Sequence, residues 1–181
     1  MAWNIDSARR QYSLSGWSGG YFDVGDSGQL LVRPRGMPGT PEIDLRELVN
    51  RLHTAGLTLP VLLRFTDILR SRVERLHGAF AGALQALDSD ARYTAIYPIK
   101  VNQQEHVVDA IVAHGGERIG LECGSKPELM IVLGSLPAGG VIVCNGYKDA
   151  EYIRLALIAQ RLGHRVTLVI EKLSELELII R

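Results

Sequence analysis

Cysteine and net charge are both scarce in this chain of 181 residues. Only two cysteines occur, Cys123 and Cys144, and their spacing suits neither a disulfide scaffold nor a structural zinc site. We therefore expect reduced thiols and a cytoplasmic location. The 20 Lys and Arg residues balance 20 Asp and Glu residues, so the sequence offers no basic surface for nucleic acid.

Long hydrophobic runs and phosphate-binding glycine motifs are also missing. No apolar run reaches the length of about 18 residues typical of a transmembrane helix, and the N-terminus has no apolar block of the kind found in a secretory signal. No Gly-x-Gly-x-x-Gly motif follows the first predicted strand, and no P-loop occurs. The five histidines are scattered, so the sequence indicates no metal site. These absences argue against a membrane protein, a dinucleotide-binding domain and a P-loop enzyme.

The first part of the chain predicts a small β segment and a linker. Residues 1–39 are rich in Gly, Ser and Pro, with strand-like stretches at 21–24 and 29–33 on either side of a turn. Thr40, Pro41 and Glu42 then resemble the start of a helix, with an N-cap, a proline at the first position and an acid in the first turn. We expect that helix to end at Gly56.

From residue 59 onward, predicted strands and helices alternate. The predicted strands cover residues 59–64, 93–99, 118–121, 141–143 and 166–170. The predicted helices cover residues 67–87, 105–114, 126–133, 149–162 and a last segment from residue 174. Such βα units predict a parallel sheet, either in an open doubly wound fold or in part of a (β/α)8 barrel. Because a complete barrel takes about 250 residues, we interpret residues 40–181 as the N-terminal portion of a barrel, preceded by the β segment 1–39.

Lys100 is the candidate reactive residue, because it follows a mostly apolar predicted strand. An unperturbed lysine has a pKa of about 10.4, so only about one in 2,500 is neutral at pH 7. A nucleophilic lysine therefore needs desolvation or a nearby positive charge, and we expect the buried end of this strand to supply the desolvation. Pro98 rules out the helical Tyr-x-x-x-Lys arrangement of short-chain dehydrogenases, and we expect it among the last residues of its strand or at a bulge. The alternative is a lysine at the rim of a sheet, with its charged end in water.

Polar residues follow the other predicted strands as well. In a (β/α)8 barrel the active site forms at the carboxyl ends of the strands, so these residues would share one mouth. They are Arg64, Lys100, Glu122, Asn145 and Glu171. Strand ends are polar in most proteins, so position alone leaves the alternative of ordinary rim residues open.

Three motifs resemble those of the biosynthetic arginine decarboxylases. They are Tyr-Pro-Ile-Lys-Val-Asn-Gln at residues 97–103, Gly-Leu-Glu-Cys-Gly-Ser-Lys at 120–126 and Val-Ile-Val-Cys-Asn-Gly-Tyr-Lys at 141–148. The resemblance extends over nearly the whole chain. It implies an alanine-racemase-like barrel that binds pyridoxal 5′-phosphate. In that family the lysine of the first motif carries the cofactor as a Schiff base, a role that falls on Lys100.

The resemblance also implies cofactor-binding roles for three further residues. Glu122 matches an acid close to the cofactor lysine in the related ornithine decarboxylases, where it assists proton transfer; its alternative role is a rim salt bridge. Glu128 matches a second family acid, although Ser125-x-x-Glu128 is also a capping box. Asn145 begins an Asn-x-x-Lys turn of the family, and a turn alone would explain its Asn-Gly pair.

The implied reaction is decarboxylation of L-arginine to agmatine and carbon dioxide, in polyamine and spermidine biosynthesis. The resemblance further implies Mg2+ and a dimer or tetramer. The family's phosphate-binding loop and substrate-selecting acids would lie beyond Arg181, so we expect this chain to be an inactive fragment of the enzyme. Other possibilities are ornithine or diaminopimelate decarboxylase, a racemase-like cofactor-binding protein, or a non-catalytic relative that binds a partner enzyme. Retention of both Lys100 and Glu122 argues against the last.

Overall fold

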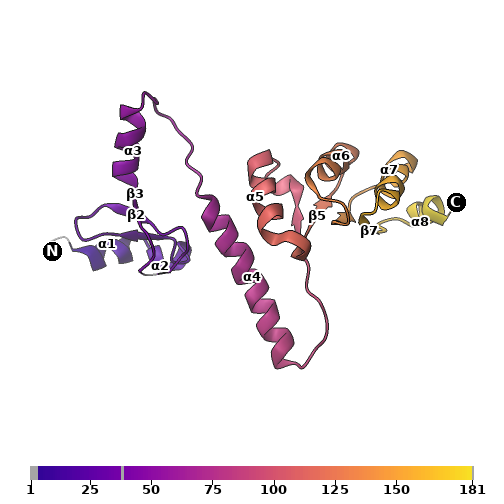
Figure 1. Cartoon of the computed structure of the whole chain (residues 1–181), viewed down its shortest axis with the longest axis horizontal. Helices are drawn as coiled ribbons and strands as arrows, with labels where there is room; N and C mark the ends of the chain where they lie inside the picture. Colours follow the sequence, from indigo (N-terminus) through magenta and orange to yellow (C-terminus); the bar gives the residue numbers. More distant parts are fainter. Residues whose placement is uncertain (1–3, 38, 181) are drawn as a thin grey trace. The chain divides into compact units, whose positions relative to one another are not determined.

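The computed structural model describes residues 4–37 and 39–180, which fall into two units, Met1–Arg72 and Val73–Arg181 (Figure 1). The domain division predicted between residues 39 and 40 stays a prediction.

The first unit is a small antiparallel sheet with short helices. Strands β1 and β2 pair with Phe22 opposite Val32, and β3 pairs with the other edge of β2. Its core includes the buried side chains of Leu14, Tyr21 and Val32. The elements in chain order are α1 (Ile5–Gln11), α2 (Leu14–Trp17), β1 (Phe22–Val24), β2 (Leu30–Val32), β3 (Ile43–Asp44) and α3 (Leu45–Thr54).

Helices α1 and α2 were not predicted, because their polar sequence resembles a linker. A side-chain cap starts α1: the backbone N–H of Ser7 donates to Asn4 Oδ1 at 2.8 Å. Ala8 on α1 and Leu14 on α2 are buried. Each helix places one of these side chains in the core of the unit. One buried residue in so short a helix gives no hydrophobic periodicity that the sequence could reveal.

The helix predicted to begin at Thr40 begins instead at Leu45. Ile43 pairs with Val32 in the sheet, so the chain is still extended where the helix was expected. The N-cap is Asp44, whose carboxylate accepts hydrogen bonds from the backbone N–H groups of Arg46 and Glu47 at 2.8 and 3.1 Å. The prediction was wrong because a local capping pattern at Thr40 cannot show that the following residues pair with β2.

A network of ion pairs surrounds Asp23 on β1. Its carboxylate accepts hydrogen bonds from Nε and Nη2 of Arg9 at 2.7 and 3.0 Å, and it lies 2.9 Å from the guanidinium of Arg33. Arg33 also donates to Glu42 at 2.6 Å. The hydrogen bond from Arg9 is the main reason that the pKa of Asp23 lies below its usual value. These contacts join α1, β1 and the chain before β3.

The second unit contains four βα repeats. Helix α4 (Thr66–Ala86) runs into it from the first unit, and no described helix, α4 included, is long and apolar enough to cross a membrane. The elements that follow are β4 (Ala95–Pro98), η1 (Ile99–Val101), α5 (Glu105–Gly115), η2 (Gly116–Arg118), β5 (Ile119–Cys123), α6 (Lys126–Ser135), β6 (Val141–Cys144), α7 (Ala150–Arg161), β7 (Arg165–Leu168) and α8 (Leu173–Ile180).

The four strands of this unit are parallel and lie in chain order, β4-β5-β6-β7. Figure 1 shows α5, α6 and α7 in a row on one side of the strands. Leu121 and Ile142 from the strands and Leu129 and Tyr152 from the helices are buried between the two layers. A doubly wound sheet would reverse its strand order and carry helices on both faces. The predicted α/β fold, part of a barrel, is confirmed.

The strand predicted at residues 59–64 is wrong. The structure describes this segment without strand pairing, and β4 is the edge strand of the parallel sheet. Leu59 and Leu62 are 68% and 75% exposed, and Pro60 has no N–H to donate to a ladder. An apolar run indicates only that a segment can be buried; a strand also needs a neighbour to pair with.

We predict that Asp23→Asn weakens the first unit. At pH 7 the free energy of unfolding should fall by about 1–3 kcal/mol, because the guanidinium groups lose a negatively charged partner and one of its two acceptor oxygens. Since the folded-state pKa of Asp23 is lowered, its contribution is complete above about pH 4 and is lost as the pH falls through that lowered value. The variant should therefore lose less stability than the unaltered chain between about pH 4 and pH 2.

Urea denaturation at a series of pH values would measure both effects. Asp26→Asn is the matched control, because Asp26 is an exposed carboxylate in the neighbouring turn. Equal acid sensitivity in Asp23→Asn and in the unaltered chain would contradict the role given to this network.

Candidate active site

The carboxyl ends of β4 and β5 bring Lys100 and Glu122 together. Strand β4 ends at Pro98, as expected, and Pro98 lies opposite Glu122 in the parallel ladder. Lys100 follows in the short helix η1, and its Nζ lies 3.6 Å from Oε1 of Glu122. Glu122 was expected just after its strand, but β5 continues to Cys123, so this glutamate is part of the ladder.

The carboxylate of Glu122 is buried with little compensation. Its side chain is only 8% exposed, and within the described residues neither oxygen takes part in a hydrogen bond. The 3.6 Å contact with Lys100 is an ion pair longer than a hydrogen bond. Buried carboxylates are costly without partners, so this one is suited to accept a hydrogen bond or a proton from a group placed beside it.

Lys100 is less buried than the sequence suggested. Ile99 is fully buried, but the side chain of Lys100 is 59% exposed, because the chain turns away from the sheet in η1 directly after Pro98. The expected desolvation by a buried strand end is therefore wrong for the described residues. The lysine amine is open to a molecule arriving from solvent, with Glu122 at its side.

Glu128 connects two loops near this pair. Ser125 caps α6 as predicted, accepting a hydrogen bond from the backbone N–H of Glu128 at 3.4 Å. The carboxylate of Glu128 accepts from the N–H of Gly124 at 2.6 Å and from the side chain of Gln103 at 3.5 Å. It therefore joins the turn after β5 to the segment after η1, in addition to its capping position.

Asn145 and Gly146 form a tight turn after β6. The N–H of Asn145 donates to Cys123 O at 2.9 Å, which extends the ladder with β5, and Asn145 Oδ1 accepts from the N–H of Gly146 at 3.0 Å. Gly146 has a φ of +88°, and a Cβ there would lie 2.7 Å from the carbonyl oxygen of Gly124. Glycine is required at this turn, which brings the loops after β5 and β6 into contact.

Glu171, after β7, joins the same set of loops. Its Oε1 accepts a second hydrogen bond from the N–H of Gly146, at 2.9 Å. The structure thus brings the strand ends that carry Lys100, Glu122, Asn145 and Glu171 to one edge of the sheet. Arg64 belongs to the first unit, and the strand whose end it was predicted to occupy is absent from the described residues, so its predicted position after a strand is wrong.

Sequence reasoning missed a buried ion pair, Lys148–Glu175. The side chain of Lys148 is fully buried, and its Nζ contacts Glu175 Oε2 at 3.7 Å. Hydrogen bonds from the backbone N–H groups of Glu171 and Lys148 lower the pKa of Glu175 below its usual value. Lys148 was noted only as the end of a turn motif, and Glu175 resembled an ordinary acid in the first turn of a surface helix.

The two cysteines belong to the core, as predicted. Cys123 and Cys144 lie opposite each other on β5 and β6. Both are free thiols, and Cys123 Sγ donates a weak hydrogen bond to Cys144 Sγ at 3.9 Å. The contact with Cys144 and burial raise the pKa of the Cys123 thiol. The contact with Cys123 lowers the pKa of the Cys144 thiol instead. Both side chains are completely buried, so no substrate can reach either sulfur atom, and neither cysteine is a catalytic candidate.

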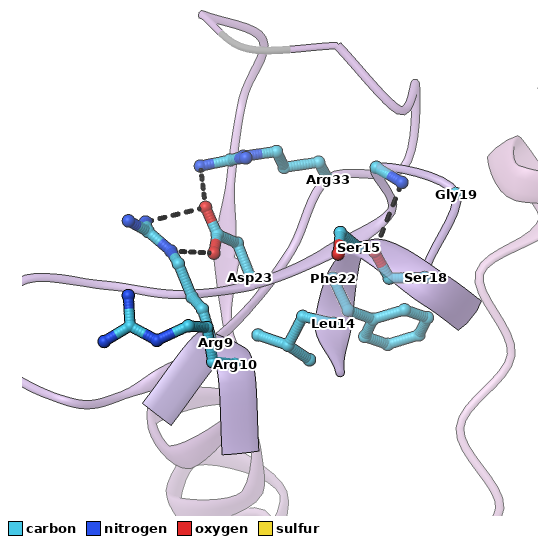
Figure 2. Close-up of a pocket in the computed structure, with 10 residues that line it drawn as sticks. Arg9, Arg10, Leu14, Ser15, Ser18, Gly19, Phe22, Asp23 and Arg33 are labelled. Carbon is cyan, nitrogen blue, oxygen red and sulfur yellow. Dashed lines mark hydrogen bonds and ion pairs between the residues drawn. The ribbon is translucent and has the colours of Figure 1, made fainter. Parts of the chain in front are cut away.

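A separate cavity of about 490 Å3 lies in the first unit (Figure 2). Figure 2 shows Asp23 between the guanidinium groups of Arg9 and Arg33, with Leu14 and Phe22 supplying apolar wall. Arg9 pairs with Asp23 and Asp6, and Arg33 pairs with Asp23 and Glu42, so the charges of these two arginines are already engaged within the protein. The cavity is therefore a less suitable reactive site than the edge that carries Lys100.

An accessible amine beside a buried carboxylate suits chemistry at a carbonyl group. The amine can form a carbon–nitrogen double bond with an aldehyde, whose oxygen leaves as water, and the carboxylate can accept a proton that the amine gives up. Lys100 and Glu122 therefore fit a cofactor that carries an aldehyde, such as pyridoxal phosphate. Glu128 and Asn145 lie on the adjoining loops.

Comparison with known proteins agrees with this fit. The family described as "Pyridoxal-dependent decarboxylase, pyridoxal binding domain" matches residues 70–181. The biosynthetic arginine decarboxylases of Pseudomonas aeruginosa and Chromobacterium violaceum are 56% and 58% identical to the chain. These matches cover 98% and 99% of the chain, but only 28% and 29% of the two relatives.

A solved structure gives the same result for the fold. The biosynthetic arginine decarboxylase of Campylobacter jejuni matches with a TM-score of 0.83 and 34% sequence identity, over 93% of this chain and 28% of that one. The chain thus spans a little more than a quarter of the length of these relatives. The resemblance found in the three sequence motifs is confirmed, and the chain belongs to the family of pyridoxal-dependent decarboxylases.

Proposed function

We propose that the protein containing this chain decarboxylates L-arginine to agmatine and carbon dioxide, with pyridoxal 5′-phosphate attached to Lys100. The observation that carries the proposal is the 3.6 Å contact between the accessible amine of Lys100 and the buried carboxylate of Glu122. The names of the relatives support arginine as the substrate, in preference to ornithine or diaminopimelate. Because the chain spans only part of their length, activity belongs to the proposal.

Lys100 is the residue that holds the cofactor and releases it to the substrate. Its side chain is 59% exposed, so both the cofactor and an incoming amino acid can reach Nζ. When bound, the cofactor supplies an electron sink for the electrons left behind by carbon dioxide. The protein contributes the position of the amine and the charge around it.

Glu122 acts as the proton-handling partner of Lys100. Its carboxylate forms an ion pair with Lys100 at 3.6 Å while the amine is free. When the amine bonds to a carbonyl carbon it must lose protons, and the nearest described carboxylate is Glu122. Burial on β5 fixes the direction of this carboxylate, which a mobile surface acid could not do.

Glu128 and Asn145 serve as cofactor-binding residues on the two loops beside this pair. Support comes from their family motifs and from the hydrogen bonds that order their loops. We also propose Mg2+ as a cofactor, a dimer or tetramer as the working form, and the cytoplasm as its location. The family resemblance supports the first two, and the small number and wide spacing of the cysteines in the sequence support a reducing compartment.

The attachment site can be tested by chemical trapping. Borohydride reduction in the presence of pyridoxal phosphate, followed by peptide mapping, should place the label on Lys100 in the product of the complete reading frame. Lys100→Ala should remove it. Label on Lys126 or Lys148 instead would contradict the assignment.

Glu122 and Glu128 provide a matched pair of variants. Glu122→Gln should lower kcat by about 100-fold or more, because it removes the proton acceptor beside Lys100. Glu128→Gln keeps an acceptor oxygen for the N–H of Gly124, so the loop should stay ordered and kcat should change little. Because the variant removes the charge of a proposed cofactor-binding residue, it should mainly raise the dissociation constant of the cofactor. Steady-state kinetics and cofactor titration would separate the two effects; a Glu122→Gln enzyme with unchanged kcat would rule out the proton-transfer role.

Release of carbon dioxide from labelled arginine, ornithine and diaminopimelate tests the reaction itself. With added pyridoxal phosphate and Mg2+, we expect release only from arginine, and only from the product of the complete reading frame. Residues 1–181 run in parallel should be inactive, because the resemblance assigns the phosphate-binding loop and the substrate acids to residues outside them. Release by residues 1–181 alone would show that they carry a complete site.

A further inference from the structure

The buried ion pair Lys148–Glu175 ties together two loops at the edge of the sheet that carries Lys100. Lys148 lies in the loop after β6, and Glu175 lies in α8, after the loop that follows β7. The two side chains are 0% and 2% exposed. Few lysines are buried so completely, and those that are need compensation for nearly all of their charge.

The contacts of this pair are mostly with backbone. Lys148 Nζ donates to the carbonyl oxygens of Gly146 and Val169, one from each loop. The carboxylate of Glu175 accepts from the N–H of Lys148 at 3.0 Å and from the N–H of Glu171 at 3.0 Å. Four backbone groups on two loops are thereby held by two charged side chains, in a closed network.

These backbone groups flank two residues of the candidate site. Gly146 follows Asn145 directly, and its N–H is held by Asn145 Oδ1 and by Glu171 Oε1. Holding the carbonyl of Gly146 and the N–H of Glu171 therefore fixes the peptide groups that orient Asn145 and Glu171. The ion pair lies beneath the edge of the site, and its own side chains are closed to solvent.

We propose that Lys148 and Glu175 are positioning residues, which set the loops after β6 and β7 in the geometry that receives the cofactor. The proposal rests on the proposed function for the identity of the ligand. Stability alone is a weak reason for such a pair, because well-packed apolar side chains are often as stabilising as a buried ion pair. A pair that fixes four backbone groups supplies a defined geometry, which apolar side chains cannot.

The test uses the product of the complete reading frame and separates positioning from stability. Lys148→Met leaves Glu175 buried without its cation and should lower both the thermal midpoint and the affinity for pyridoxal phosphate. The double variant Lys148→Met/Glu175→Gln contains no unpaired charge, so its thermal midpoint should recover in large part. Its cofactor dissociation constant should stay raised, on the order of tenfold, because the Gly146 and Val169 carbonyls are still released.

Lys126→Met is the matched control. Lys126, at the start of α6, pairs with Asp149 and Glu151 at the start of α7, at 2.8 and 2.7 Å. Its loss removes two ion pairs but none of the contacts that hold Gly146, Val169 or Glu171. Cofactor affinity in this variant should equal that of the unaltered protein. Amide hydrogen exchange gives a second readout. The N–H groups of Gly146 and Glu171 should exchange faster in the Lys148→Met variants, and their exchange rates should be unchanged in the control.

The outcomes are distinguishable. Recovery of cofactor affinity together with the thermal midpoint in the double variant would overturn the proposal, as would unaltered affinity in Lys148→Met. If the unaltered protein shows no cofactor label on Lys100, the proposed function fails instead. Amide exchange at Gly146 and Glu171 would then still decide whether the ion pair orders these loops: unchanged exchange in the variants would reject it.

Discussion

The parallel register between β4 and β5 is the constraint on which the candidate site depends. With Pro98 opposite Glu122, the chain that leaves β4 carries Lys100 past the end of its strand and beside the glutamate on the next one. A slip of one residue would turn the Glu122 side chain to the other face of the sheet and separate the two groups. The same ladder places Cys123 opposite Cys144, so Asn145 begins its turn level with the end of β5.

Much of the second unit could be predicted from the sequence because its signals are local. The capping box at Ser125 located the start of α6, and the alternation of predicted strands and helices indicated a parallel sheet. The errors lie where tertiary context decides. Residues 59–64 have the composition of a strand but no partner, and α3 starts only at Leu45 because Ile43 is held in a sheet. Local composition carries no information about either partner.

In the candidate site, too, some features follow from the sequence and others depend on tertiary contacts. The general rule that barrel sites form at the carboxyl ends of strands was enough to associate Lys100 with Glu122 and Asn145 with Glu171. It could not reveal the exposure of Lys100, which depends on the turn taken after Pro98, nor the ion pair between Lys148 and Glu175. That pair joins residues from two different loops, and no spacing rule relates them. Its only sequence trace was the Asn-x-x-Lys turn, in which the lysine resembled a surface residue.

Two lysines therefore occupy this edge of the sheet in opposite environments. Lys148 is buried, and its amine is engaged by two carbonyl oxygens and a carboxylate, so a reacting carbonyl compound could reach it only by breaking that network. Lys100 has one contact of this kind, with a carboxylate that has no other described partner, and its amine faces solvent. Burial alone would favour Lys148 as the reactive lysine. The number of contacts made by each amine favours Lys100 instead, because a nucleophile must be able to leave its contacts. A positioning residue, by contrast, is effective only while it keeps them.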